Sequence, residues 1–260
     1  AKLALTCFLA SYFTRRYDEV RGKKFSAAKP FIVMGVLGIF LLAQPDLGST
    51  VVLFVITFGM LFIVGANFWQ FILLIGTGIL LFVWLVLSAS YRLKRFTGFL
   101  EPFKDPYGTG FQLTNSLMAF GRGEISGEGL GNSIQKLDYL PEAHTDFIMA
   151  IIGEEFGFIG ILVVVILLGL LIFRAMKIGR ESLMLEQRFR GFFALGISFW
   201  IFFQGFVNLG MALGMLPTKG LTFPLVSYGG SSIIIMSATV GILLRIDHEN
   251  RLQRGGQARL

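Results

Sequence analysis

The sequence predicts an all-α polytopic membrane protein. The evidence is a hydrophobic share of 54%, a mean hydropathy of +0.71, and basic residues gathered between long apolar stretches. A helix needs about 20 apolar residues to cross roughly 30 Å of hydrocarbon. We therefore expect seven visible spans, the first of them cut short, in residues 1–14, 30–44, 47–66, 69–91, 145–173, 190–213 and 222–244.

Residues 30–66 are the one stretch that reads as either one helix or two. A single helix of that length would extend about 55 Å, which exceeds the thickness of a bilayer. Pro45 lies midway and cannot continue a helix. We therefore expect two spans, with Asp46 bonding the free backbone amides at the start of the second.

Basic residues assign the two faces of the membrane. They cluster after the first span, near residues 174–190, and at the C-terminal end. An even number of spans separates each cluster from the next, so all three lie on one side. The positive-inside rule makes that side cytoplasmic. The loop 92–144, with six basic and six acidic residues, is then extracytoplasmic, together with Gln44–Gly48 and Met215–Thr222.

Several functional classes are excluded by composition. The net charge of +7 does not indicate nucleic acid, because the charge follows the loops of a membrane topology; anionic membrane lipids are its expected partner. Cys7 is the only cysteine, so no internal disulfide forms. With His144 and His248 as the only histidines, we expect no zinc site. No cofactor is indicated, and the involvement of a divalent cation stays open.

The chain opens inside an apolar run, so we expect it to be a fragment that begins within a truncated span. We expect a single transmembrane domain over residues 1–254 and a cytoplasmic tail over 255–260.

Polar residues gather at the outer ends of the expected helices. Asp146 opens the longest apolar run, and an ionisable group at such a position is a functional-site hypothesis. The alternative is that Asp146 only stabilises a helix N-terminus through the helix dipole. Glu142 and His144 either orient a substrate or belong to an ordinary surface loop. Glu154 and Glu155 are expected to be hydrogen-bond partners between helices rather than catalysts.

Two long motifs resemble the SEDS family (shape, elongation, division and sporulation). They are Tyr139-Leu-Pro-Glu-Ala-His-Thr-Asp-Phe147, followed by Gly153-Glu-Glu-Phe-Gly157, and Gly214-Met-Leu-Pro-Thr-Lys-Gly-Leu-Thr-Phe-Pro-Leu-Val-Ser-Tyr-Gly-Gly-Ser-Ser232. The resemblance extends from residue 1 to about 254. It implies a ten-helix bundle whose first three helices precede this chain. Thr218-Lys219-Gly220 resembles the cell-division branch rather than the elongation branch.

The resemblance also implies a function. Family members polymerise lipid II into glycan strands at the outer face of the bacterial cytoplasmic membrane, here at the division septum. Expected partners are lipid II, undecaprenyl-pyrophosphate-linked glycan, a class B penicillin-binding protein and other divisome proteins. A lipid II flippase and a non-catalytic divisome scaffold are the alternatives.

Within that reading, glycosyl transfer needs a base for the acceptor 4-hydroxyl and cations for the departing pyrophosphate. Asp146 is the expected catalytic base. Lys2 resembles the family lysine that pairs with this aspartate; otherwise it is a lysine whose ammonium reaches the membrane interface. Lys219 lies in an outer loop and suits a lipid-linked anion. Arg92 either binds pyrophosphate or anchors the chain at the interface.

Overall fold

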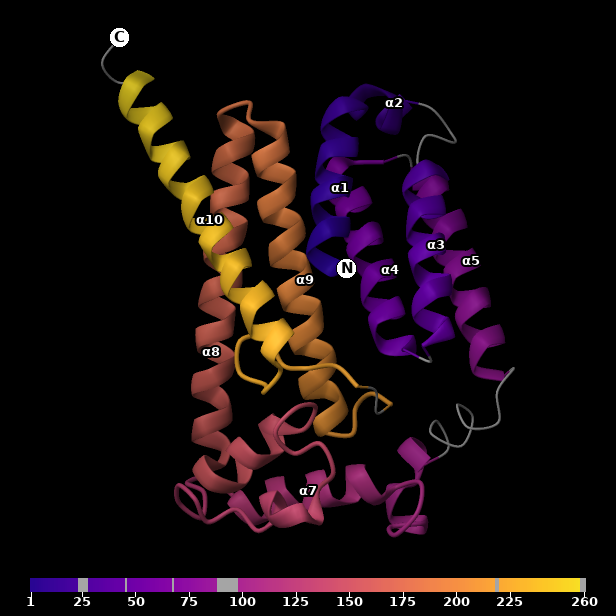
Figure 1. The fold of residues 1–260 in the computed structure, drawn as a ribbon, viewed down its shortest axis with the longest axis vertical. Coiled ribbons are helices and arrows are strands. Elements are labelled where there is room, and N and C mark those ends of the chain that lie inside the picture. The colour runs from indigo at the N-terminus through magenta and orange to yellow at the C-terminus, as the bar shows by residue number, and fades with distance from the viewer. Residues whose placement is uncertain (23–27, 45, 67, 88–97, 218–219, 258–260) are drawn as a thin grey trace. The chain divides into compact units, whose positions relative to one another are not determined.

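The computed structural model describes residues 1–22, 28–44, 46–66, 68–87, 98–217 and 220–257. All regular secondary structure in these residues is helical, and loops connect the helices (Figure 1). The elements are α1 (Lys2–Arg15), α2 (Tyr17–Gly22), α3 (Ala28–Ala43), α4 (Leu47–Val64), α5 (Phe68–Leu87), η1 (Pro102–Lys104), α7 (Phe111–Gly123), η2 (Gln135–Tyr139), α8 (Ile148–Met184), α9 (Arg188–Ala212) and α10 (Gly230–Gln257). Four of the described helices are long and apolar enough to cross a membrane: α4, α8, α9 and α10. The prediction of a helical membrane protein is confirmed.

The chain forms two compact units. Unit 1 comprises residues 1–79, 170–203 and 234–260, and unit 2 comprises residues 80–169 and 204–233. The proposed division of residues 30–66 into two helices is confirmed, because α3 ends before α4 begins. Pro45 itself lies outside the described residues. Asp46 caps α4 as expected: its Oδ1 accepts from the Ser49 amide at 2.8 Å, which satisfies one of the free donors at that terminus.

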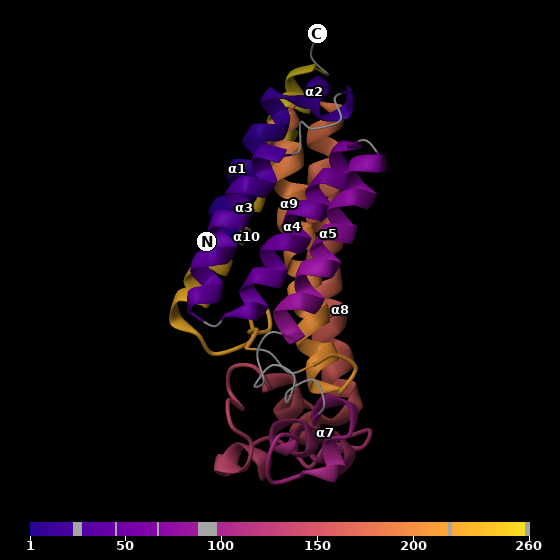
Figure 2. The same ribbon diagram turned by 90° about the vertical axis from the view of Figure 1, so that its right-hand side faces the viewer.

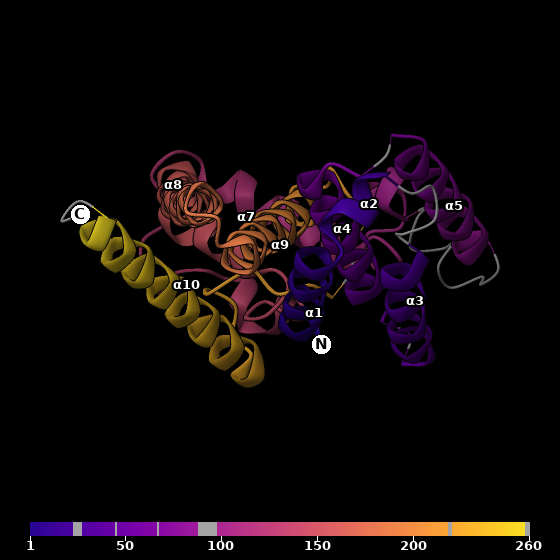
Figure 3. The ribbon, with the colours of Figure 1, turned by 90° about the horizontal axis from the view of Figure 1, so that it is seen from above.

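In unit 1, α9 packs closely against α1 and α4 because glycines lie where the helices cross (Figures 1 and 3). A Cβ added at Gly59 of α4 would lie 2.2 Å from the ring of Phe199. One added at Gly196 of α9 would lie 2.7 Å from Thr6 Cγ2. Small residues of this kind let membrane helices approach one another.

The basic segment 174–190 is helical, not the loop that we expected. α8 continues to Met184, and only residues 185–187 link it to α9. The side chains of these helical turns have partners on α10: Arg174 Nη2 lies 3.1 Å from Asp247 Oδ2. Ion pairs between α8 and α10 stabilise these charged helical turns.

Unit 2 gathers α7 and its flanking loops at the Ile148 end of α8 (Figure 2). The expected span over residues 145–173 corresponds to α8, which is long and apolar enough to cross a membrane, but its start and its regularity differ from the expectation. The helix starts at Ile148 and breaks at Gly157, whose φ of 64° and ψ of −162° are essentially restricted to glycine. Four backbone hydrogen bonds of 2.9–3.2 Å to residues 124–129 replace the helical bonds lost there: Phe158 N to Glu124 O, Ile159 N to Ile125 O, Glu128 N to Glu154 O, and Gly129 N to Glu155 O.

The last span also begins later than expected. Residues 222–229 form a loop, and α10 starts at Gly230. Leu225 has a φ of 64°, which a helix does not allow. The loop forms because its polar groups bond to the segment that carries Asp146, as described below.

Candidate active site around Asp146

The segment that carries Asp146 is held through its main chain. Three consecutive carbonyls accept hydrogen bonds: Asp146 O from Asn208 Nδ2 at 2.7 Å, Thr145 O from Ser227 Oγ at 2.5 Å, and His144 O from the Tyr228 amide at 2.8 Å. These bonds join residues 144–146 to the loop before α10 and to α9. The position of Asp146 is thus fixed by bonds that do not involve its carboxylate.

Asn208 on α9 is the central residue of this arrangement, and our sequence analysis missed it. Its side chain is fully buried, and its Nδ2 donates to the carbonyls of both Asp146 and Leu221. One turn earlier, Gln204 Nε2 donates to Thr222 O at 2.8 Å. The signal that could have found them is a pair of amide side chains four residues apart in an apolar helix, because polar groups in spans bond to a partner.

The Asp146 carboxylate lies beside Gly220. A Cβ added at Gly220 would lie 3.3 Å from Asp146 Oδ2, so a side chain at that position would crowd the carboxylate. Asp146 is half-buried and lies in a turn that precedes α8. It lies two residues before the start of α8, so the catalytic role and the structural role through the helix dipole both stay predictions.

The other residues expected at the site have different surroundings. Glu142 is exposed with a φ of 58°, and its Oε2 accepts from Thr145 Oγ1 at 2.5 Å. His144 is exposed too. Both lie on the same turn as Asp146. Their role toward a substrate stays a prediction.

Lys2 is the first residue of α1 in unit 1, whereas Asp146 belongs to unit 2. Within unit 1, the Asp46 carboxylate attracts the Lys2 ammonium, so the hairpin before α4 contributes to the lysine's surroundings. The pairing of Lys2 with Asp146 stays a prediction. Arg92 and Lys219 lie outside the described residues.

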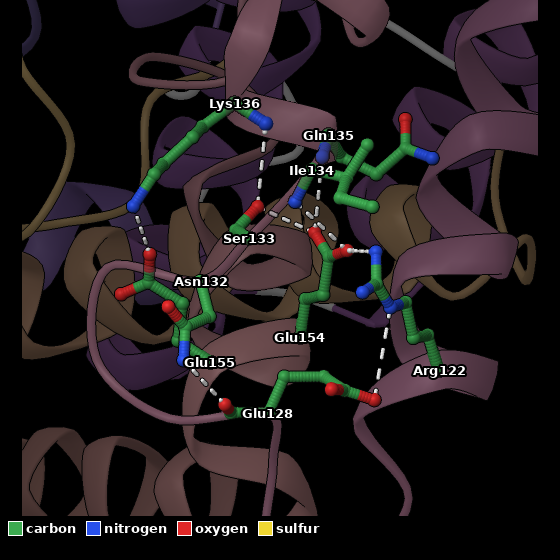
Figure 4. Close-up of polar contacts among 9 residues, drawn as sticks. All are labelled: Arg122, Glu128, Asn132, Ser133, Ile134, Gln135, Lys136, Glu154 and Glu155. Atoms are coloured by element: carbon green, nitrogen blue, oxygen red, sulfur yellow. Dashed lines mark hydrogen bonds and ion pairs between the residues drawn. The ribbon is translucent and has the colours of Figure 1, made fainter.

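A second cluster surrounds Glu154, which is fully buried (Figure 4). Its carboxylate accepts from the Ser133 hydroxyl, from the amides of Ile134 and Gln135 at 3.1 and 3.2 Å, and from Arg122 Nη1 at 3.4 Å. The expectation that Glu154 is paired is confirmed. Its partners, however, come from α7 and the following loop rather than from a neighbouring span.

Glu155 takes a similar structural part: its Oε1 lies 2.6 Å from Lys136 Nζ. In the described part of the chain, no three His, Cys, Asp or Glu side chains group to hold a metal ion. The Asp146 turn presents a positioned carboxylate, which can accept a proton from a hydroxyl brought within hydrogen-bond reach.

Residues 1–252 match the family FTSW_RODA_SPOVE, described as Cell cycle protein. The chain is 84% identical over its whole length to the "Probable peptidoglycan glycosyltransferase FtsW" of Pasteurella multocida. It is 87% identical over its whole length to the protein of the same name from Haemophilus influenzae. In both comparisons the chain spans 66% of the relative's length, just under two thirds.

Solved structures also resemble the chain, at lower identity. One, described as "Structural coordination of polymerization and crosslinking by a peptidoglycan synthase complex", matches with a TM-score of 0.75 and 28% identity, covering 96% of this chain and 69% of the other. The rod shape determining protein RodA of Thermus thermophilus matches with a TM-score of 0.63 and 27% identity, covering 96% of this chain and 64% of the other.

Proposed function

This chain belongs to the FTSW_RODA_SPOVE family, and from that premise we propose that the intact protein is a peptidoglycan glycosyltransferase that polymerises lipid II during septal cell-wall synthesis. Relatives at 84% and 87% identity carry the name of that activity. The observation that carries the proposal is the Asp146 turn, because its main chain is held by three hydrogen bonds while the carboxylate lies beside Gly220.

We propose that the apolar helices are seven spans of a ten-helix bundle in the bacterial cytoplasmic membrane. In this topology the loop 92–144 and the Asp146 turn face the outside. Residues 1–254 form one transmembrane domain, and residues 255–260 are a cytoplasmic tail. The ion-paired basic turns of α8 and α10 support a cytoplasmic position for those ends.

In the proposed reaction, the 4-hydroxyl oxygen of the acceptor attacks the anomeric carbon of the undecaprenyl-pyrophosphate-linked sugar. Asp146 accepts the proton of that hydroxyl during the attack. A carbon–oxygen bond forms there, and the bond to the pyrophosphate breaks with its electron pair on the leaving group. The leaving pyrophosphate needs cations. We assign that role to Lys2, Arg92 and Lys219.

We assign the orientation of the sugar to Glu142 and His144. Their supporting observation is that both are exposed on the Asp146 turn. The chain indicates no cofactor, and a divalent cation beside the pyrophosphate is left open.

We also propose a class B penicillin-binding protein as the partner that crosslinks the new strand, together with other divisome proteins. The structural relative with a TM-score of 0.75 comes from work on a peptidoglycan synthase complex that coordinates polymerization and crosslinking, which supports this assignment.

The test is polymerisation of labelled lipid II by the full-length protein with its partner, comparing wild type with Asp146→Asn. A lost general base typically costs 10²–10⁴-fold in rate. Glu101→Gln is the matched control, because Glu101 is an exposed carboxylate that pairs only with Lys104 among the described ion pairs; it should polymerise at the wild-type rate.

The alternative functions give different results in the same assay. A flippase would move lipid II across liposomes that contain no acceptor strand and would lose this movement in Asp146→Asn. A scaffold would leave polymerisation by a second enzyme unchanged by the substitution. Polymerisation by Asp146→Asn at the wild-type rate would refute the catalytic assignment.

A further inference from the structure

Unit 1 contains an open pocket of about 510 Å³ that the proposed glycosyl transfer does not use. Its lining comes from α2, the end of α4, and the turn between α8 and α9: Tyr17, Ile63, Leu183, Glu186, Arg188 and Phe192. Arg21 of α2 and Arg188 at the start of α9 belong to basic segments that the positive-inside rule places at the cytoplasmic surface.

Two guanidinium groups converge on the ring of Tyr17. Arg188 Cζ lies 4.4 Å from the ring centroid, and Arg21 Cζ lies 5.3 Å from it. Arg21 Nη1 also donates to the Tyr17 hydroxyl at 2.9 Å. The ring is itself stacked on Phe192 at 6.0 Å between centroids. The aromatic pair thus holds two cations together at one edge of the pocket.

These two arginines differ from the basic groups of unit 1 that form ion pairs. The other basic groups of this face that form ion pairs do so at 2.6–3.5 Å: Arg16 with Glu19, Arg174 with Asp247, Arg190 with Glu249, Arg245 with Glu249, Arg251 with Asp247 and Arg254 with Glu181. Within the described residues, Arg21 and Arg188 form no ion pair. Arg188 and Glu186 are the charged side chains of the lining, and Arg21, held at the lining residue Tyr17, adds a second guanidinium group, so these three side chains carry a net positive charge.

The remaining lining is apolar, with Ile63 and Leu183 half-buried and Phe192 buried. A ligand that suits both parts has an anionic phosphate head and a hydrocarbon body. Guanidinium groups bind phosphate oxygens in charge-assisted hydrogen bonds, and basic pockets between helices at the cytoplasmic surface suit acidic lipid heads. We propose that this pocket binds the phosphate headgroup of an anionic membrane phospholipid, with Arg21 and Arg188 as its ligands.

The experiment measures lipid retention by native mass spectrometry on the full-length protein in neutral detergent. The probes are phosphatidylglycerol, phosphatidylcholine of the same chain length, and inorganic phosphate. Wild type should retain phosphatidylglycerol in preference to phosphatidylcholine. Arg21→Gln with Arg188→Gln should bind phosphatidylglycerol at least about tenfold more weakly, because each hydrogen bond to a charged group is worth more than a factor of ten.

Arg245→Gln is the matched control, since Arg245 is an exposed arginine of the same face that pairs with Glu249 at 2.8 Å; its retention should equal that of wild type. Equal retention by the double variant and the control would overturn the proposal. So would binding of inorganic phosphate as strong as that of the lipid, which would indicate a soluble anion. The wild-type preference between the two lipids needs no substitution, and its absence would overturn the proposal even if the double variant failed to fold.

Discussion

Asp146 and Glu154 are two carboxylates of the same segment of unit 2 with opposite surroundings. Glu154 is fully buried, and its carboxylate accepts from one hydroxyl, two amides and a guanidinium group. Asp146 is half-buried. The hydrogen bonds that hold its turn are accepted by the backbone carbonyls of residues 144–146.

The difference separates a fully buried carboxylate, whose oxygens join α7 and its loop to α8, from a half-buried carboxylate beside Gly220 on a turn that is held through its main chain. Burying a charge is costly unless donors surround it, so the Glu154 oxygens are committed to holding α7 and its loop on α8. The Asp146 turn is held by hydrogen bonds to the backbone carbonyls of residues 144–146, which a side-chain substitution leaves in place. A substitution of Asp146 should therefore change chemistry, whereas a substitution of Glu154 should change folding.

The largest effect on stability is expected for Glu154→Ala. It leaves the buried Ser133 hydroxyl and the part-buried amides of Ile134 and Gln135 without their acceptor, and each such unsatisfied group costs about 1–3 kcal/mol. Thermal unfolding of the purified protein measures the loss. Glu128→Ala is the control, because Glu128 is exposed and contacts, at 3.6 Å, the arginine that also contacts Glu154. Equal melting temperatures for the two variants would contradict the structural role of Glu154.

A smaller loss is expected for Gly157→Ala. The backbone conformation of Gly157 strains any residue with a side chain by about 1–3 kcal/mol. The added Cβ would also lie 2.4 Å from Ile125 O. Hydrogen exchange should show faster exchange at the amides of Phe158 and Ile159, which bond to this loop. Gly169→Ala is the control, because nothing lies within 4 Å of a Cβ added there. Unchanged exchange would show that the loop does not depend on the break.

A loss of stability similar to that of Gly157→Ala is expected for Asn208→Leu. It removes the donor to Asp146 O and Leu221 O, and unpaired buried carbonyls cost about 1–3 kcal/mol each. Part of this is offset, because the substitution also removes Asn208 Oδ1, a buried acceptor without a partner in the described structure. We expect a net loss of about 2 kcal/mol, with a drop in polymerisation that exceeds what the unfolded fraction explains. Activity that follows folding alone would refute a positioning role for Asn208.

The sequence predicted the features that depend on local pattern. The length of the apolar runs predicted the helices, the division of residues 30–66 into two helices was correctly expected, and Asp46 was correctly expected to cap α4. Each follows from residues close together in the chain, where helix length and capping chemistry are decisive.

The features that the sequence did not predict depend on distant segments. The break at Gly157 lies in an apolar run and forms because residues 124–129 take over its hydrogen bonds. The late start of α10 follows from bonds between Ser227 and the Asp146 turn. Asn208 was missed although an amide in an apolar helix is itself a signal. Asp146 was found because it opens the longest apolar run within a recognisable motif.

The most direct test of the account measures polymerisation rate and melting temperature together for Asp146→Asn and Glu154→Ala, in the full-length protein with its partner. We expect Asp146→Asn to lose 10²–10⁴-fold in rate. Its melting temperature should stay unchanged, because the hydrogen bonds that hold the turn are accepted by the backbone carbonyls of residues 144–146, which the substitution keeps. Glu154→Ala should lower the melting temperature, and the protein that remains folded should keep its rate. A melting temperature that falls for Asp146→Asn, or a rate that stays at the wild-type value, would contradict the claim that Asp146 is placed for catalysis.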